Sequence, residues 1–425
     1  FVIWIINRKH LSKKELTDLW IGILNFSKSN NVVNQLYLMK NLLRIDIDQN
    51  RIFGLDIVRA IAILFVVITH SGNFIPRDFK SIYKSLIYDG VGIFFVLSGF
   101  LIGGILIKQI ENYKFNFKSL LYFWCKRWSR TLPNYYLFLV VLLFIEVLTV
   151  DKFQIKNHLS YFIFSQNLTH SPPDFFSHSW SLSVEEWFYL ITPLILFLLL
   201  SLFKIKFRYT FLFVIITIII GVSILRLKVI EDFSSWNEFK NIVDGVIYRF
   251  DSLMYGMLGA YIAYYFPEFW NKYKKPFLLL CFSFFILHFI LKELVFESSN
   301  YVYRSFVFSL TSITVLASLP YLSNFKTSKS KLWKPITYIS LISYSLYLAN
   351  SVIVQKIELL IDWQKIIQLS NHQFSLSIPW TFALLFNYVL SWILSFIIAT
   401  LVYKYFEIPS TNYLRKKINI SLDKK

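Results

Sequence analysis

Long apolar runs alternate with short polar segments along most of this chain. Each run holds about 17–25 residues, the length that an α-helix needs to cross a hydrocarbon layer about 30 Å thick. A shorter apolar stretch at 157–168 cannot span, and we expect it to lie at the membrane interface or to re-enter the membrane. The pattern predicts ten membrane-spanning helices, near residues 57–75, 89–109, 132–150, 185–203, 209–227, 248–266, 277–296, 304–323, 336–358 and 379–404.

The distribution of basic residues predicts how these helices are oriented. From Met39 onward, 26 Lys and Arg lie on the side that holds both chain ends, against 13 on the other side. Short cationic loops remain in the cytoplasm. We therefore expect an all-α, polytopic integral membrane bundle with both termini cytoplasmic. The formal net charge of +19 then records membrane orientation and does not indicate a nucleic-acid partner.

The first 38 residues differ from the rest of the chain. The sequence begins with Phe1, and residues 1–38 carry charged patches without a full-length apolar run. Met39 lies shortly before the first convincing helix. We expect translation to start at Met39, with 1–38 as an extension and 39–425 as one membrane domain. The alternative is a genuine cytoplasmic or interfacial leader.

The composition agrees with a membrane protein. Apolar residues make up 56% of the chain and charged residues 16%, whereas a soluble domain has about 45–50% and roughly 25%. The two cysteines, Cys125 and Cys281, give neither a disulfide framework nor the spacing of metal ligands. We expect no metal site.

Arg59 and His70 stand out in the first apolar helix. Eleven residues separate them, so they lie within about 20° of one helix face, with His70 roughly 16 Å further toward the outer side. Ionisable side chains in a membrane usually face the bundle interior or a wet cavity, and histidine exchanges protons near neutral pH. We expect both residues to be catalytic. The alternative is a core histidine and an arginine that reaches lipid phosphates.

A second basic cluster lies in WCKRWSRTLPNYY, at the expected cytoplasmic entrance of the third helix. Arg127 and Arg130 have i,i+3 spacing and point to the same side. Guanidinium groups bind phosphate through two parallel hydrogen bonds. Together with Lys126, they are candidates for binding a highly phosphorylated cytosolic cofactor. A positive-inside cluster facing lipid headgroups is an equally supported alternative.

The segment SHSWSLSVEEWFYL carries the third group of candidates. Glu185 and Glu186 open the expected fourth helix from the outer side, where a carboxylate can orient a sugar hydroxyl or assist an acid–base step. The alternative is that they only complement the helix dipole. His178, Trp180 and Ser181 precede them and are candidates for binding a carbohydrate, although the aromatic residues suit an interfacial belt equally well.

Taken in order, these motifs resemble the integral-membrane acyltransferase-3 family, whose members modify cell-surface glycans. GLDIVRAIAILFVVITH is similar to the family's first-helix signature, and Arg127-x-x-Arg130 to its third-helix pair. The resemblance covers about residues 51–415. It departs from the family at Trp187, where Gln is common, and at Asn350, where His is common. The other matching segments are GVGIFFVLSGFLIGGIL, WSLSVEEWFYLITPLIL, ISYSLYLANSVIV and YKYFEIPSTNYL.

The resemblance implies transfer of an acyl group, usually acetyl, from cytosolic acetyl-CoA to a carbohydrate at the outer face of a bacterial cell membrane. It implies a catalytic role for His70 and a supporting or CoA-binding role for Arg59, Arg127 and Arg130. The implied partners are acyl-CoA, the lipid bilayer and a cell-surface or lipid-linked carbohydrate. Direct transfer and relay to a separate extracytoplasmic protein both stay open, as do the acceptor glycan and acetyl against succinyl.

Other function classes fit parts of the pattern. A proton-coupled transporter of a small anion or glycan precursor would use His70 as a proton relay, although no internal repeat typical of such transporters is visible. A purely structural subunit would keep all activity after His70→Ala. In an enzyme, His70 would act as a general base or carry the acyl group transiently.

Overall fold

The structure, a computed structural model, describes residues 42–48, 50–112, 115–203, 205–230, 244–295, 301–326, 331–357, 361 and 379–423. Within these ranges the regular elements are helices, and no strand occurs. The all-α fold predicted from the apolar pattern is therefore confirmed. The expected extension 1–38 and its boundary at Met39 lie outside the described residues.

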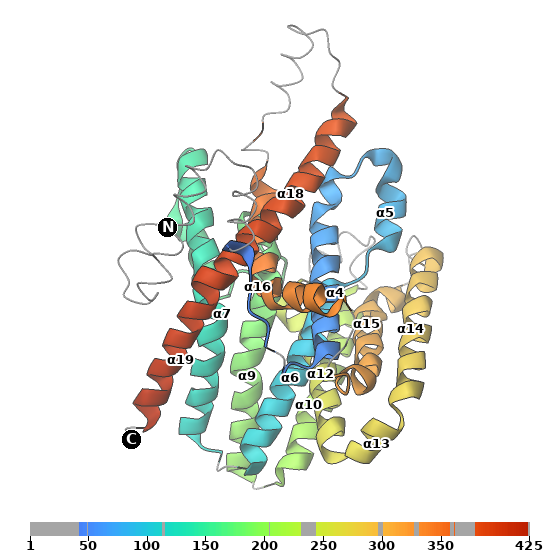
Figure 1. The fold of residues 1–425 in the computed structure, drawn as a ribbon. Coiled ribbons are helices and arrows are strands. Elements are labelled where there is room, and N and C mark those ends of the chain that lie inside the picture. Colours follow the sequence, from blue (N-terminus) through green and yellow to red (C-terminus); the bar gives the residue numbers. More distant parts are fainter. Residues whose placement is uncertain are drawn as a thin grey trace, which may run out of the picture.

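Ten long helices form the bundle (Figure 1), at the ten predicted positions. Nine stretches of the described chain are long and apolar enough to cross a membrane. The remaining predicted span, 248–266, is helix α12 (Phe250–Tyr265), which is the shortest of the ten with 16 residues. The other nine are α4 (Phe53–His70), α6 (Gly90–Asn112), α7 (Phe117–Thr149), α9 (Trp180–Phe203), α10 (Phe207–Ile230), α14 (Lys274–Val295), α15 (Tyr301–Leu322), α16 (Trp333–Lys356) and α18 (Trp380–Val402).

Two of these helices begin well before their predicted starts. Helix α7 starts at Phe117, where Asn116 and Ser119 form a reciprocal capping box, and it continues through Pro133. A capping box satisfies two backbone N–H groups that would otherwise lack a partner, so it fixes the helix start at Phe117. Pro133, sixteen residues further on, does not interrupt the helix. Helix α9 starts at Trp180, so Glu185 lies beyond its first turn. A helix-dipole role for this carboxylate is wrong, because that effect falls off within the first turn.

Short helical segments complete the chain. The stretch predicted not to span contains the turns η3 (Ile155–His158) and α8 (Leu159–Phe162), which are far too short to cross a membrane. Helix α18 does not stop at residue 404 as predicted. It continues through a π-helical turn, Tyr403–Glu407, into α19 (Ile408–Asp423). The minor helices are η1 (Ser71–Phe74), η2 (Arg77–Phe79), α5 (Lys80–Leu86), η4 (Asp174–Ser179), η5 (Val246–Tyr248) and α13 (Pro267–Lys272).

Helix α4 lies within the bundle and packs against α6, α15 and α16. Behind it, α6 and α12 approach one another so closely that only glycine fits at the contact. A Cβ atom on Gly99 would lie 1.9 Å from the carbonyl oxygen of Leu253, and one on Gly256 would lie 2.0 Å from that of Val96. Small residues permit such close helix contacts in membranes. Large apolar side chains such as Leu202 cover the outside of the bundle, where lipid would contact them.

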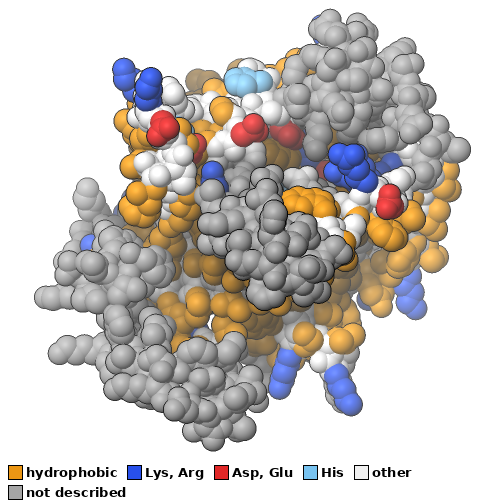
Figure 2. All heavy atoms as spheres, turned by 90° about the horizontal axis from the view of Figure 1, so that it is seen from above, with side chains coloured by type: hydrophobic (Ala, Val, Ile, Leu, Met, Phe, Trp, Pro, Cys, Tyr) orange, Lys and Arg blue, Asp and Glu red, His pale blue; other side chains and the backbone are white. Residues whose placement is uncertain are grey.

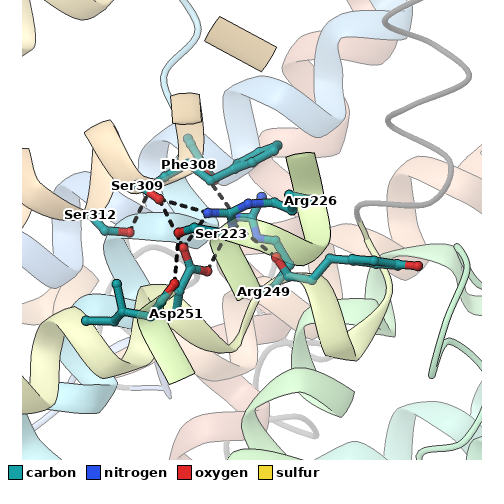
Figure 3. A network of polar contacts seen from close by, with 10 residues as sticks. Ser223, Arg226, Arg249, Asp251, Phe308, Ser309 and Ser312 are labelled. Carbon is teal, nitrogen blue, oxygen red and sulfur yellow. Dashed lines mark hydrogen bonds and ion pairs between the residues drawn. The ribbon is translucent and has the colours of Figure 1, made fainter. Parts of the chain in front are cut away.

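A buried ion pair joins α10, α12 and α15 (Figure 3). Arg226 and Asp251 are both fully buried, with Nη2 and Oδ2 only 2.5 Å apart. Ser309 of α15 accepts a hydrogen bond from Arg226 at 2.8 Å and donates one to Asp251 at 3.1 Å. Because an isolated charge is costly in a membrane bundle, the two partners depend on one another and hold the three helices in register.

Candidate functional site

The larger of two cavities lies at the end of the bundle where α4 ends and α9 begins. Its volume is about 890 Å³, and its walls include three predicted site residues, His70, His178 and Trp180. Asp89 and Lys292 also line it. Figure 2 looks onto this end of the molecule and shows acidic, basic and histidine side chains among the apolar ones. We call this space the outer cavity, because the charge distribution predicts this end to be extracytoplasmic.

His70 is held by groups from two other elements. Its Nδ1 lies 3.0 Å from Oδ1 of Asn350 on α16. Its ring centroid lies 3.7 Å from that of His178 and 6.0 Å from that of Tyr347. The fold thus brings together two histidines that the sequence separates widely, at the wall of a polar cavity where an imidazole can exchange protons with a ligand.

Tyr347 connects His178 to the interior of the bundle. Its hydroxyl donates a hydrogen bond to the backbone carbonyl oxygen of His178, and Ser181 Oγ lies 2.7 Å from the same hydroxyl. The Nδ1 atom of His178 lies 3.1 Å from Ser351 Oγ. His178 and Ser181, both candidates from the sequence, are therefore joined through a tyrosine from another helix.

This tyrosine lines a second, smaller cavity. It has a volume of about 110 Å³ and is lined by three predicted arginines, Arg59 of α4 and Arg127 and Arg130 of α7. Glu185 and Tyr347 also line it. Three guanidinium groups against one carboxylate make its walls strongly basic, which favours an anionic ligand. We call it the inner cavity.

A chain of hydrogen bonds holds one of these arginines in place. Arg127 Nη2 donates to the Tyr189 hydroxyl at 3.0 Å, and this hydroxyl donates to Glu185 Oε2 at 3.0 Å. Ser98 Oγ donates to the other carboxylate oxygen at 2.8 Å. The Arg127 guanidinium carbon also lies 4.5 Å from the centre of the Tyr189 ring. Glu185 therefore faces the inner cavity and orients Arg127, whereas the sequence placed it at the outer mouth.

Arg59 and His70 share a helix but line different cavities. Arg59 Nη1 lies 3.8 Å from Asp56 Oδ1, and Asp56 is also bound by Arg51 at 2.5 Å. The roughly 16 Å that eleven residues add along a helix explains the separation. A common face, which the sequence predicted, thus leads to two sites at different depths rather than one.

The remaining predicted residues lie beside the cavities. Glu186 is buried, and the ammonium group of Lys126 lies 4.1 Å from the centre of the Tyr122 ring. The Trp180 ring lies 5.2 Å from the guanidinium carbon of Arg249, so one face of this indole is taken by a cation. The ring contacts hold Lys126 and Trp180 against the protein. Of the three residues, Trp180 is the one in a cavity wall.

Sequence reasoning missed a buried polar cluster close to α7. Glu407, in the π-helical turn, accepts hydrogen bonds from Asn134 Nδ2 at 2.8 Å and from Ser345 Oγ at 2.6 Å. All three residues are buried. An acidic residue near the end of a long apolar run was the available signal, but its two partners come from helices distant in the sequence.

No metal-binding arrangement occurs in the described part of the chain, where three or more His, Cys, Asp or Glu side chains never gather in one place. Within each cavity wall, polar side chains form hydrogen bonds with neighbouring protein groups, such as His70 with Asn350 and Arg127 with Tyr189.

Comparison with known proteins gives a consistent picture. The profile of an acyltransferase domain, acyltransferase-3, matches residues 52–403. The O-acetyltransferase OatA of Staphylococcus aureus strain NCTC 8325 is 28% identical over 396 residues, which cover 86% of this chain and 57% of the relative. A putative O-acetyltransferase of Staphylococcus aureus strain COL is 26% identical over 334 residues, covering 71% of this chain and 50% of the relative. The chain thus spans about half the length of these curated relatives. No solved structure matches it.

Proposed function

This chain belongs to the integral-membrane acyltransferase-3 family, and from that premise we propose that it is an O-acyltransferase. The donor is cytosolic acyl-CoA, acetyl-CoA first of all, and the acceptor is a hydroxyl of a cell-surface or lipid-linked carbohydrate. Both chain ends are cytoplasmic, and the membrane is that of a bacterial cell. The observation that carries the proposal is the pair of cavities, one basic and one containing His70, whose walls share Val91. Tyr347, in the wall of the basic cavity, has its ring centroid 6.0 Å from that of His70.

The inner cavity supplies the donor side. A thioester of CoA carries several phosphates, and the guanidinium groups of Arg59, Arg127 and Arg130 offer charge-assisted hydrogen bonds to such groups. At about 110 Å³ the cavity admits a small part of the donor, so most of the CoA molecule lies toward the cytoplasm. Tyr189 already holds Arg127 in place through a hydrogen bond. Arg127 therefore loses little further side-chain freedom when it binds a phosphate.

The outer cavity supplies the acceptor side and the base. A sugar hydroxyl enters the cavity beside His70, which takes the hydroxyl proton as the oxygen attacks the thioester carbonyl. The carbon–sulfur bond breaks, and the departing CoA thiolate takes up the proton that His70 removed from the hydroxyl, which regenerates the neutral imidazole. In the relayed variant, His70 first forms an acyl-imidazole and the sugar hydroxyl then removes the acyl group. His178 and Trp180, in the same wall, are placed to contact the sugar.

The proposal predicts that His70→Ala abolishes O-acylation of the host glycan. A positioned general base contributes about 10²–10⁴-fold, so ester content should fall at least about 100-fold relative to wild type. The measurement is NMR of the surface glycan from a deletion strain complemented with each variant at equal membrane level. His170→Ala is the matched control, because His170 is an exposed histidine of the predicted outer loop.

Three outcomes separate the hypotheses. Restoration of the ester by wild type and by His170→Ala, but not by His70→Ala, supports the enzyme and identifies the acceptor sugar from the restored resonance. Full restoration by His70→Ala overturns the role of this histidine. If deletion changes no ester in any glycan, the acyltransferase proposal fails in that host and export of a small anion or glycan precursor becomes the function to assay.

A further inference from the structure

We propose that Asn350 determines which ring nitrogen of His70 carries the proton, and that Asn350 is therefore a positioning residue for the base. The inference rests on the proposed function. Asn350 is fully buried on α16, and its Oδ1 lies 3.0 Å from Nδ1 of His70. An amide oxygen can only accept a hydrogen bond, so this contact requires the N–H group to be on Nδ1.

The orientation of the Asn350 amide is set by the neighbouring helix, α18. Ser395 Oγ donates its hydrogen to the backbone carbonyl oxygen of Ser391 at 2.6 Å. With this hydrogen used, Ser395 can only accept from Asn350, whose Nδ2 lies 3.1 Å from Oγ. The amide nitrogen therefore points to α18 and the amide oxygen to His70. The series of hydrogen bonds begins at the backbone carbonyl of Ser391, which can only accept. Each following group must therefore donate toward this carbonyl and accept on its other side.

Burial makes this chain of hydrogen bonds effective. Asn350, Ser391 and Ser395 are all fully buried, so reversing the amide would place its oxygen against the Ser395 oxygen, acceptor against acceptor, without water to compensate. Nδ1 of His70 consequently holds the proton in the neutral imidazole, and the lone pair resides on Nε2. A histidine base needs such a group at its second nitrogen to hold the correct tautomer.

The sequence supports a specific role for this position. Asn350 is one of the two sites where the chain departs from the common residues of the family pattern it resembles. Here the side chain offers a neutral acceptor to His70 and a donor to Ser395 at once. The amide thus links the catalytic helix α4 to α18 through α16 without introducing a further charge into the bundle.

Four substitutions test the assignment in membrane vesicles of the deletion strain. Asn350→Leu keeps the number and branching of the side-chain heavy atoms but removes the acceptor, whereas Asn350→Asp keeps an acceptor oxygen toward His70. Ser395→Ala removes the group that orients the amide. Ser391→Ala is the matched control, because only the backbone carbonyl of Ser391 takes part, and its hydroxyl donates to Tyr388 instead. The measured quantity is transfer of radiolabel from acetyl-CoA to the host envelope glycan, as a function of acetyl-CoA concentration.

We expect Asn350→Leu and Ser395→Ala to lower the maximal rate about 10-fold or more, within the range of a general base, while the half-saturating acetyl-CoA concentration stays unchanged. Asn350→Asp and Ser391→Ala should retain most of the rate. A wild-type maximal rate in folded Asn350→Leu would overturn the inference. So would a variant that raises the half-saturating acetyl-CoA concentration but keeps the wild-type maximal rate. Should Asn350→Leu fail to accumulate, Ser395→Ala decides by the same criteria. An inactive His70→Ala beside fully active Asn350 and Ser395 variants would refute this inference alone. An active His70→Ala would refute the role of His70 as the base, and membranes that transfer no label even with the wild-type protein would refute the proposed function.

Discussion

At the scale of single residues, the arginines of the inner cavity differ in how they are held. Arg127 is fixed by the Tyr189 hydroxyl and lies over its ring, and Arg59 is close to Asp56. Arg130 lines the same cavity but is exposed. An exposed guanidinium is accessible to a ligand, so Arg130 is the member of the set from which we expect a direct contribution to anion binding.

Replacing Arg130 should weaken the donor interaction without disturbing the fold. We expect Arg130→Gln to raise the half-saturating acetyl-CoA concentration about 10-fold or more, because a hydrogen bond to a charged group contributes about 1.5–3 kcal/mol and about 1.4 kcal/mol is a factor of ten. The vesicle transfer assay measures this directly. Lys416→Gln, an exposed basic residue on α19, is the control and should behave as wild type. An unchanged half-saturation in Arg130→Gln would remove this residue from the donor site.

Individual site residues were predictable to the extent that their chemistry was out of place in an apolar helix. Arg59 and His70 were visible for that reason. Tyr347 and Ser395 were not, because hydroxyl groups are common in membrane helices and gain meaning only from what they touch. The position of Glu185 was misjudged because the start of α9 was placed five residues too late.

At the scale of elements, the contact between α6 and α12 shows how small residues position the site. Gly99 and Gly256 let the two backbones touch, and Ser98 of the same helix α6 then reaches Glu185. The site therefore depends on a close approach between α6, which lines the inner cavity, and α12, whose residues line neither of the two cavities. The glycines of α6 are not equivalent, since a Cβ on Gly104 would meet nothing within 4 Å.

This difference predicts opposite outcomes for two alanine substitutions on one helix. Gly99→Ala should destabilise the protein by about 1–3 kcal/mol, the usual cost of overpacking, because its Cβ would collide with the Leu253 carbonyl oxygen. Gly104→Ala should leave stability unchanged or slightly raised. Thermal unfolding of the purified proteins in detergent measures both. Equal melting temperatures for the two variants would show that the α6–α12 contact is looser than described.

At the scale of the whole molecule, the ion pair of Arg226 and Asp251 connects α10 with α12. Both side chains are fully buried, and Ser309 of α15 accepts a hydrogen bond from Arg226 and donates one to Asp251 (Figure 3). The pair forms hydrogen bonds with Tyr248 and Ser309, and neither of these is a predicted catalytic residue. We assign it to the assembly of α10, α12 and α15 rather than to chemistry.

Breaking the pair on one side should be more harmful than removing it entirely. We expect Asp251→Ala to cost about 3–5 kcal/mol, because it leaves the Arg226 guanidinium buried without its carboxylate. The double variant Arg226→Met with Asp251→Leu should recover most of this loss, since well-packed apolar residues often replace a buried ion pair at little cost. Melting temperatures in detergent test the cycle. A double variant less stable than Asp251→Ala alone would contradict the interpretation.

The sequence alone determined the class of this protein and the number of its long helices. The thickness of the membrane sets the length of an apolar run. Because a run is a continuous stretch of sequence, its length can be counted without knowledge of any tertiary contact. Helix ends were less predictable. The capping box at Asn116 and Ser119 overrode the signal of Pro133, and α18 continues past its predicted end through a π-helical turn.

Only the tertiary structure decided which residues meet. Arg59 and His70 share a helix face, yet the depth of each places them in separate cavities. His70 acquires its partners from η4, α16 and, through Asn350, α18, and no local pattern encodes contacts between residues so far apart in the chain. Helix periodicity gives the direction of a side chain, whereas packing between helices decides what lies in that direction.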